Sequence, residues 1–121
     1  MSTVSDHKAI VEKYFDGARR GDHQQVLSCV TDDVLFEIYG KARVRGRAAL
    51  EAALNAIAGH PTLTVDRLIE AGDIVVVVGS GSVALAAGGG LEFRFCDVFT
   101  FSGDAISRLE SYQVSLDGSS G

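Results

Sequence analysis

The sequence predicts an α+β fold in which a curved antiparallel sheet wraps around helices, and two features of the chain predict it. Apolar residues recur at helical spacing in the first half of the chain, whereas the second half consists of strand patterns. Short turn signals such as Ala71-Gly72-Asp73 and Ser102-Gly103-Asp104 separate those strands, and strands joined in this way are antiparallel neighbours. The chain has 121 residues, which is enough for one domain over residues 1–121.

Two helices are predicted at the start of the chain. The first runs from Asp6 to Arg20, because its apolar residues recur at helical spacing and place Tyr14 on the apolar side. Asp22 is then expected to cap a second, short helix, with Gln25 completing a capping-box-like pair.

A strand and a basic segment follow the second helix. Thr31-Asp32-Asp33 is expected to form a turn, and the alternation from Val34 to Tyr39 predicts a strand with Ile38 on its apolar face. The basic segment comes next, and its alternating charges are typical of a solvated edge rather than of a phosphate site; it comprises Lys41, Arg43, Arg45 and Arg47.

The third helix is expected from about Arg47 to Ala58. Its apolar stripe is narrow, rich in alanine, and includes Leu54. Gly59-His60-Pro61 should stop the helix, because proline cannot continue it.

The rest of the chain is predicted to form strands only, which are Leu63–Glu70, Ile74–Leu85, Leu91–Phe101 and Ile106–Val114, with Gly88-Gly89-Gly90 as a hairpin turn. The run from Ile74 to Val78 is apolar without alternation, a pattern typical of a strand that is buried on both faces. Because the helices can cover only one face, a homodimer is expected to cover the other.

One carboxylate lies in a row of apolar side chains. Successive side chains of a strand point to opposite faces, so Asp97 shares its face with Leu91, Phe93, Phe95, Phe99 and Phe101. An ionised aspartate without partners is strongly disfavoured there. Asp97 is therefore expected to be hydrogen-bonded, to be held as the neutral acid, or to line a cavity that admits polar groups. A slip of one residue would instead turn it outward to solvent.

Composition and charge exclude several classes of function. The net charge of -5 argues against nucleic acid or an anionic membrane as a partner, since both require clustered Lys and Arg. Charged residues near the start argue against a signal peptide, so a cytoplasmic protein is expected. Cys29 and Cys96 are expected to be reduced. Neither a metal site nor a cofactor is expected, because the three histidines are scattered and the glycine-rich stretches lack the context of a phosphate loop.

Four segments in this order resemble the NTF2-like superfamily, and within it the SnoaL-like polyketide cyclases and ketosteroid isomerases; they are residues 11–22, Thr31-Asp32-Asp33-Val34, Arg45-Gly46 and residues 97–103. The resemblance covers nearly the whole chain. It implies a cone of curved antiparallel sheet, closed by three helices over an apolar pocket, in a protein that is usually dimeric.

The ketosteroid isomerase pattern further implies roles for single residues. It places the oxyanion-hole tyrosine at Tyr14 and a protonated aspartic acid at Asp97, two donors that would stabilise an oxygen as it gains negative charge. The chain departs from the pattern at Ile38, where the family has its general-base aspartate, and at Leu54, where some members have a further tyrosine. Isoleucine cannot move a proton.

Glu110 is the replacement base that the resemblance favours, because it shares with Arg108 and Tyr112 a face of the last strand that resembles the pocket side. The alternative is an Arg108–Glu110 ion pair on the outer surface. Limonene epoxide hydrolases use an arginine between two aspartates, but Phe95 stands two positions before Asp97, which argues against that chemistry.

The expected ligand is a small, mostly apolar molecule with a carbonyl or hydroxyl group. Side chains expected to contact it are Ile38, Leu54, Phe95, Phe99 and Tyr112. Three functions remain open: a cofactor-independent isomerase or cyclase acting next to a carbonyl, a binding protein without turnover, and a dimeric interaction module. Ile38 counts against proton abstraction and leaves binding untouched.

Overall fold

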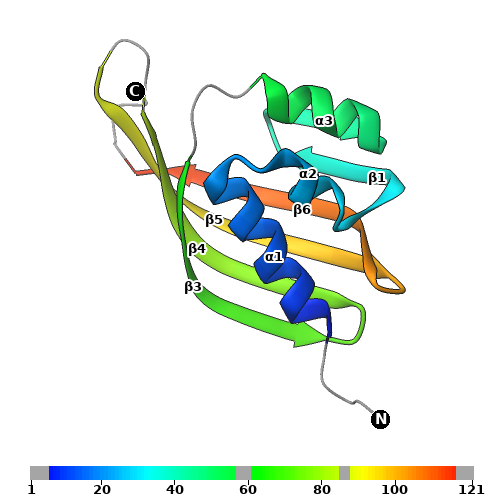
Figure 1. Cartoon of the computed structure of the whole chain (residues 1–121). Coiled ribbons are helices and arrows are strands. Elements are labelled where there is room, and N and C mark those ends of the chain that lie inside the picture. The colour runs from blue at the N-terminus through cyan, green and yellow to red at the C-terminus, as the bar shows by residue number, and fades with distance from the viewer. Residues whose placement is uncertain (1–5, 57–60, 85–87, 117–121) are drawn as a thin grey trace.

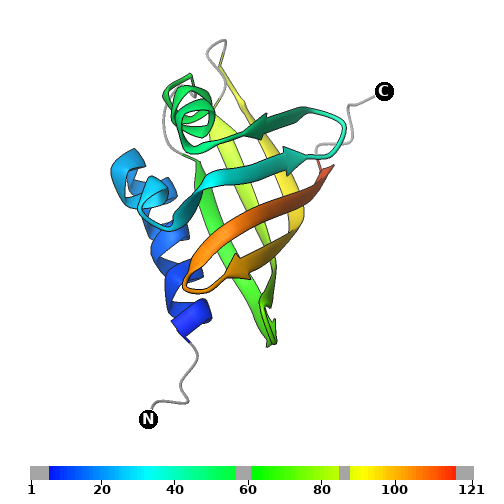
Figure 2. The same ribbon diagram turned by 90° about the vertical axis from the view of Figure 1, so that its right-hand side faces the viewer.

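The computed structural model describes residues 6–56, 61–84 and 88–116. A six-stranded sheet curves around the helices, which lie on one side of it (Figures 1 and 2). This arrangement confirms the predicted α+β class and the predicted sheet that wraps around helices.

The helices are α1 (Asp6–Arg20), α2 (His23–Leu27) and α3 (Arg47–Asn55). Asp22 caps α2 as predicted, because its carboxylate accepts a hydrogen bond from the main-chain N–H of Gln25 at 3.1 Å. The side chain of Gln25 does not complete a capping box. It donates instead to the main-chain oxygen of Lys13 at 2.9 Å and to the carboxylate of Asp16 at 2.9 Å, which ties α2 to α1. The predicted stop of the third helix lies partly outside the described residues.

The strands are β1 (Val30–Ile38), β2 (Ala42–Arg45), β3 (Thr62–Ala71), β4 (Ile74–Ala84), β5 (Gly90–Ser102) and β6 (Ala105–Ser115). Their order in the sheet is β2-β1-β6-β5-β4-β3; β1 and β6 are parallel and every other pair is antiparallel. The predicted turn at Thr31-Asp32-Asp33 is wrong, because these residues continue β1, whose first residue Val30 pairs with Ile106.

An extra residue in β6 decides which of its side chains face the helices. Phe101 pairs with Ile106, but the preceding residue Thr100 pairs with Arg108, so Ser107 is left over as a bulge. Ile106 and Leu109 are both buried even though three positions separate them. The bulge thus reverses the alternation, and after it the inner face of β6 carries Leu109 and Ser111.

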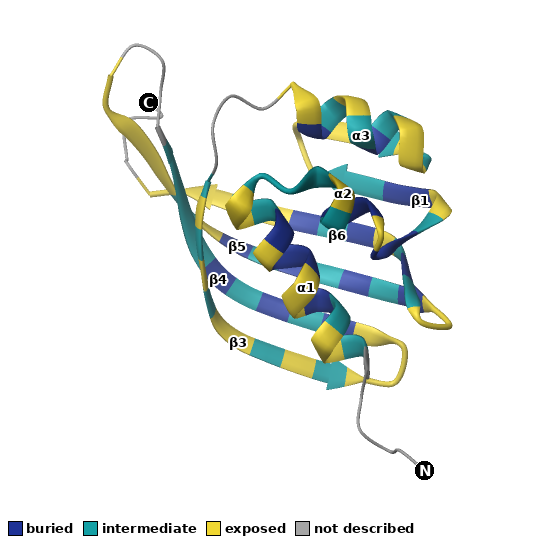
Figure 3. Ribbon diagram, in the orientation of Figure 1, coloured by how far each residue is buried: buried dark blue, intermediate teal, exposed yellow. Residues whose placement is uncertain are grey.

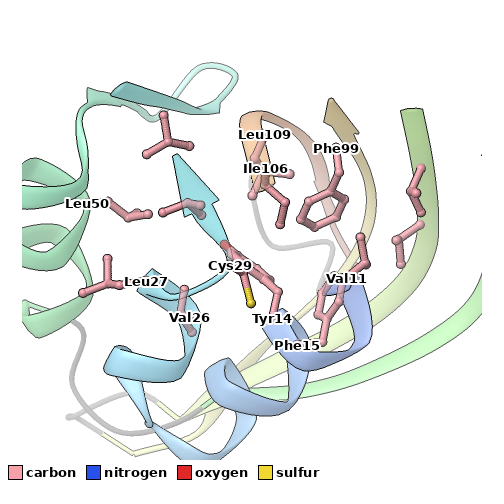
Figure 4. Close-up of a cluster of buried hydrophobic side chains, with 14 of the residues drawn as sticks. Val11, Tyr14, Phe15, Val26, Leu27, Cys29, Leu50, Phe99, Ile106 and Leu109 are labelled. Carbon is pink, nitrogen blue, oxygen red and sulfur yellow. The ribbon is translucent and has the colours of Figure 1, made fainter. Parts of the chain in front are cut away.

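Aromatic packing fixes α1 against the sheet (Figure 4). The ring of Phe99 is fully buried and makes edge-to-face contacts with Tyr14 at 5.3 Å and with Phe15 at 5.7 Å between centroids. Burying a phenylalanine contributes about 2 kcal/mol, and each such ring pair adds about 1 kcal/mol. The middle of α1 is therefore held directly over β5.

The two faces of β4 differ in burial (Figure 3). Val75 and Val77 point inward and are fully buried, whereas Ile74 is 40% exposed and Val76 and Val78 are half-buried. The predicted burial on both faces is therefore wrong for a single chain. The outward side chains of this strand are the ones that a partner would have to cover.

Two glycines in β4 make room for aromatic rings. Gly79 and Gly81 pair with Phe95 and Phe93 of β5. A Cβ atom at Gly79 would lie 2.9 Å from Cζ of Phe95, and one at Gly81 would lie 2.6 Å from Cζ of Phe93. A Cβ atom at Gly79 would also clash with the main-chain oxygen of Thr64 on β3, so the neighbouring strand and the phenylalanine rings both require the absence of a side chain on β4.

Candidate functional site

A cavity of about 320 Å³ lies between the helices and the inner face of the sheet. Its wall is mainly apolar and includes Phe36 and Ile38 from β1, Leu54 from α3, and Phe93 and Phe95 from β5. Its polar lining comes from Tyr14, Asp97, Ser111 and Gln113. An apolar hollow with a few convergent polar groups is the usual form of a small-molecule site.

Asp97 lines this cavity and has a buried carboxylate oxygen without a hydrogen-bond partner. The residue is 8% exposed, and its Oδ1 atom is buried without a hydrogen-bond partner. Burial raises the pKa of Asp97 to about 6, although a hydrogen bond from the Ser111 side chain acts in the opposite direction. Buried polar atoms are almost always paired in proteins, so an unpaired carboxylate oxygen marks a place for a ligand atom or water.

Tyr14 reaches the same cavity from α1. It is 7% exposed and lines the cavity, and its ring makes edge-to-face contacts with Phe15 and Phe99 of the core. Burial is the main cause that raises the pKa of Tyr14, and the negative charge of Asp97 is the second. Tyr14 is therefore a neutral phenol at physiological pH, able to donate a hydrogen bond.

Ser111 and Gln113 of β6 supply the rest of the polar lining. Ser111 is directly opposite Asp97 in the strand pairing and is 3% exposed. The Gln113 amide donates to the Ser111 hydroxyl at 3.3 Å. The cavity thus has polar groups from α1, β5 and β6 within an otherwise apolar wall.

Residues 11–109 match the family model of the SnoaL-like domain. The chain belongs to the SnoaL-like domain family. Other solved structures with this fold are described as NTF2-like proteins, which confirms the cone fold that the sequence predicts. No match is found among proteins of curated function.

Three solved structures illustrate what this SnoaL-like chain is similar to. An LEH-like epoxide hydrolase of Mycobacterium tuberculosis has a TM-score of 0.82 and 20% identity over 90% of this chain and 83% of that one. RV0760c of the same organism, in complex with estradiol-17beta-hemisuccinate, has a TM-score of 0.82 and 16% identity over 89% and 93%. TerC, co-crystallised with polyporic acid, has a TM-score of 0.78 and 25% identity over 88% and 90%.

The structure brings together most of the residues that the sequence singles out in this SnoaL-like domain. Ile38, Leu54 and Phe95 line the cavity together with Tyr14 and Asp97. Phe99 does not line it. Its ring is fully buried beneath Tyr14, where it supports the helix instead of meeting a ligand.

Glu110 and Tyr112 lie on the opposite face of the sheet, so the expectation that they face the cavity is wrong. Glu110 accepts a hydrogen bond from the hydroxyl of Tyr39 at 2.9 Å and pairs with Arg108 at 3.4 Å. Tyr112 stacks on Tyr39 at 4.8 Å between centroids and is 47% exposed. The physical reason is the bulge at Ser107, which shifts the alternation of β6 by one residue. The surface ion pair, the alternative left open, is what the structure contains.

Ser111 and Gln113 are the polar cavity residues that sequence reasoning missed. The signal was Leu109, an apolar residue that defines the inner face and implies, by alternation, that the next two inward positions are Ser111 and Gln113.

Two further hollows lie away from this cavity. One is lined by hydroxyl side chains of β3 and β4, including Thr64 and Ser80, and the other lies between α1 and β3 near Arg19. Within the described ranges, no group of three His, Cys, Asp or Glu side chains could hold a metal ion, and no helix is long and apolar enough to span a membrane. Cys29 and Cys96 are free.

Replacing Asp97 with asparagine is expected to raise the free energy of unfolding at neutral pH by up to about 3 kcal/mol, because the amide avoids the cost of a buried charge. A carboxyl group whose pKa is raised on folding stabilises the folded state below its ordinary pKa of 3.8, and this contribution is lost as the pH increases through about 6. The gain in Asp97→Asn should therefore be largest above about pH 7 and should vanish toward about pH 4, as measured by urea unfolding.

The matched control is Glu92→Gln, which neutralises an exposed carboxylate on the same strand. It should change the unfolding free energy by less than about 0.5 kcal/mol at every pH. A pH-independent effect of Asp97→Asn would contradict the burial of a charge at this position.

Proposed function

We propose that this SnoaL-like protein binds a small, mostly apolar molecule whose hydroxyl or carbonyl group lies between Tyr14 and Asp97. The observation that carries the proposal is that Asp97, a residue lining an apolar cavity, has a buried Oδ1 atom without a hydrogen-bond partner. An isolated buried acceptor costs about 1 to 3 kcal/mol, and a ligand that donates to it recovers part of that cost.

The size of the cavity favours a compact ligand. Ligand sites range from about 300 to 1,000 Å³, and the volume of about 320 Å³ lies at the lower end. A molecule of about two fused rings suits this volume better than a larger one. Two proteins of the same fold, TerC and RV0760c, were solved with small organic ligands, which supports a ligand role for this chain.

The protonation states favour a hydroxyl group on the ligand. With a pKa of about 6, Asp97 is mainly ionised at neutral pH and can only accept hydrogen bonds, whereas Tyr14 can donate one. A hydroxyl group offers both a donor for Asp97 and an acceptor for Tyr14. A carbonyl group pairs with Tyr14 alone unless Asp97 is protonated.

Binding of β-naphthol, which has two fused rings and one hydroxyl, tests this function. Binding is measured by the change in naphthol fluorescence, and we expect micromolar affinity for the wild-type protein. Asp97→Ala and Tyr14→Phe should each lower the affinity at least about fivefold, because each removes one hydrogen bond to the ligand. Naphthalene, which lacks the hydroxyl, should bind the wild type and both variants with similar affinity.

Glu110→Gln is the matched control, because Glu110 lies on the other face of the sheet and should leave naphthol binding unchanged. Equal affinity of the wild type and Asp97→Ala for naphthol would remove Asp97 from the site.

Proton transfer next to a carbonyl is a second candidate function, and the free oxygen of Asp97 favours it. A carboxylate with a pKa near neutrality is suited to take a proton from carbon and return it. The electron pair of the broken C–H bond would move onto the carbonyl oxygen, which Tyr14 would stabilise as an enolate. Asp97 would then act as the base, and not as the neutral donor that the resemblance implies.

Hydrogen–deuterium exchange of β-tetralone, a ketone of two fused rings, measures this step by NMR. The protein-dependent rate should rise with pH through about 6, because the base must be ionised, and should fall by at least about a hundredfold in Asp97→Asn. If the rate does not exceed that of buffer alone, the proposed turnover fails while ligand binding stands.

We further propose that the protein is a homodimer formed through the outer face of the sheet. Outward apolar side chains on this face include Ile74, Val76 and Val78 of β4 and the stacked pair Tyr39 and Tyr112. Contiguous exposed apolar surface of this kind is typical of an interface.

Sedimentation velocity at micromolar concentration should show a dimer for the wild type. Val76→Lys should sediment as a monomer, because a lysine in the middle of the interface would be buried without a partner. Ala48→Lys, on the exposed side of α3, should remain dimeric. A monomeric wild type would rule out the interface.

A further inference from the structure

Lys41, Gln113 and Ser111 connect the surface of the protein to the buried carboxylate. Lys41 lies in the turn between β1 and β2, and its ammonium group donates to Oε1 of Gln113 at 3.4 Å. The Nε2 atom of Gln113 donates to the hydroxyl oxygen of Ser111 at 3.3 Å. Ser111 is 3% exposed and stands directly opposite Asp97 in the pairing of β5 with β6.

We propose that these three residues form a directional hydrogen-bond chain in which the Ser111 hydroxyl is held as a donor to Asp97, so that the Oδ1 atom of Asp97 stays available to a donor on the ligand. The role in ligand binding rests on the function proposed above. The hydrogen-bond chain itself does not, because its Lys41–Gln113 and Gln113–Ser111 hydrogen bonds are present in the free protein. Ser111, Gln113 and Lys41 are thus positioning residues for Asp97.

The direction of the chain follows from the chemistry of its members. An ammonium group can only donate, so the oxygen of the Gln113 amide faces Lys41 and the NH₂ group faces Ser111. That NH₂ group can also only donate, so the Ser111 oxygen accepts from it. The hydrogen of the Ser111 hydroxyl is then free to point at the carboxylate of Asp97, which accepts when ionised.

Main-chain contacts hold the first member of the chain near the last. The N–H of Tyr39 donates to the main-chain oxygen of Ser111 at 3.1 Å, and the N–H of Lys41 donates to that of Ile38 at 2.9 Å. The turn that carries Lys41 is therefore fixed to β6 at the level of Ser111. A lysine held in this way meets Gln113 at a smaller cost in conformational entropy than a free surface lysine would.

The charge state of Asp97 depends on few other groups. Tyr14 of α1 is the other titratable residue among the described residues that line the cavity, and Cys29 lies close to Tyr14. On β4, the residue opposite Asp97 is the apolar Val77. The Ser111 hydroxyl lowers the pKa of Asp97 against the effect of burial, so the chain favours the ionised, accepting form.

The test is the titration of the Asp97 carboxyl group in the free protein, measured by the NMR chemical shift of its carboxyl carbon. The signal is assigned by its loss in Asp97→Asn. Ser111→Ala should shift the midpoint upward by about one pH unit, because one hydrogen bond to the charged form is lost. Lys41→Met should also shift the midpoint upward, by roughly a few tenths of a pH unit. Without the ammonium group the Gln113 amide can flip its oxygen and NH₂ group, so the Ser111 hydroxyl is no longer held as a donor to Asp97. Lys41 is exposed, so this variant leaves the core intact.

A matched variant and a double variant distinguish an effect transmitted through the hydrogen-bond chain from the effect of losing a positive charge. Arg43→Met removes an exposed positive charge from the adjacent strand β2 and should shift the midpoint less than Lys41→Met does. In the Ser111→Ala background, Lys41→Met should have no more effect than Arg43→Met, because the link to Asp97 is already broken.

An unchanged midpoint in Ser111→Ala overturns the proposal, and so does a shift in Lys41→Met that equals the one in Arg43→Met or persists in full without Ser111. These titrations need no ligand. If the titration midpoint of Asp97 shifts as predicted but the protein does not bind β-naphthol, the proposed function is disproved and the hydrogen-bond chain stands.

Discussion

The contact of Phe99 with α1 is the packing interaction on which the cavity depends. Phe99 is fully buried, and its edge-to-face contacts with Tyr14 and Phe15 hold the helix over the middle of the sheet. Asp97 is two residues before Phe99 on the same face of β5, so the support under Tyr14 also sets the place of the carboxylate. The phenol and the carboxylate meet in one hollow because one aromatic residue fixes both elements.

The site holds a charge that the fold would be more stable without. A carboxyl group whose pKa is raised to about 6 is ionised at neutral pH at the expense of stability. Groups that cost stability are typical of functional sites, where a ligand or a reaction makes use of them. Ser111 reduces the cost by a hydrogen bond and leaves one oxygen unpaired.

The sequence predicts those helices and strands in which no bulge interrupts the helical spacing or the strand alternation of apolar side chains. Helical spacing predicts the limits of α1, and the alternation in β5 predicts that Asp97 shares the inner face with the phenylalanines. Alternation cannot reveal a bulge, so the single extra residue Ser107 reverses the inner and outer faces of β6 and turns Glu110 away from the site. Nor does alternation reveal how deeply an inward side chain is buried, so it does not show that Phe99 belongs to the core and not to the cavity wall. At Thr31-Asp32-Asp33, β1 continues through a register irregularity between Val30 and Leu35, which the local preference of aspartate for turns does not predict.

The hydrogen-bonding groups of the cavity and the shape of its wall near the glycines of β4 come from different residues. The hydrogen-bonding groups stand on α1, β5 and β6, whereas the wall near Gly79 and Gly81 consists of the Phe95 and Phe93 rings that rest on bare main chain. Substitutions along this wall would alter the length and shape of the molecule that fits, with the acid and the phenol left in place. Selectivity for shape and the chemistry of recognition are thus encoded in different segments of the chain, and related proteins could diverge in one while they retain the other.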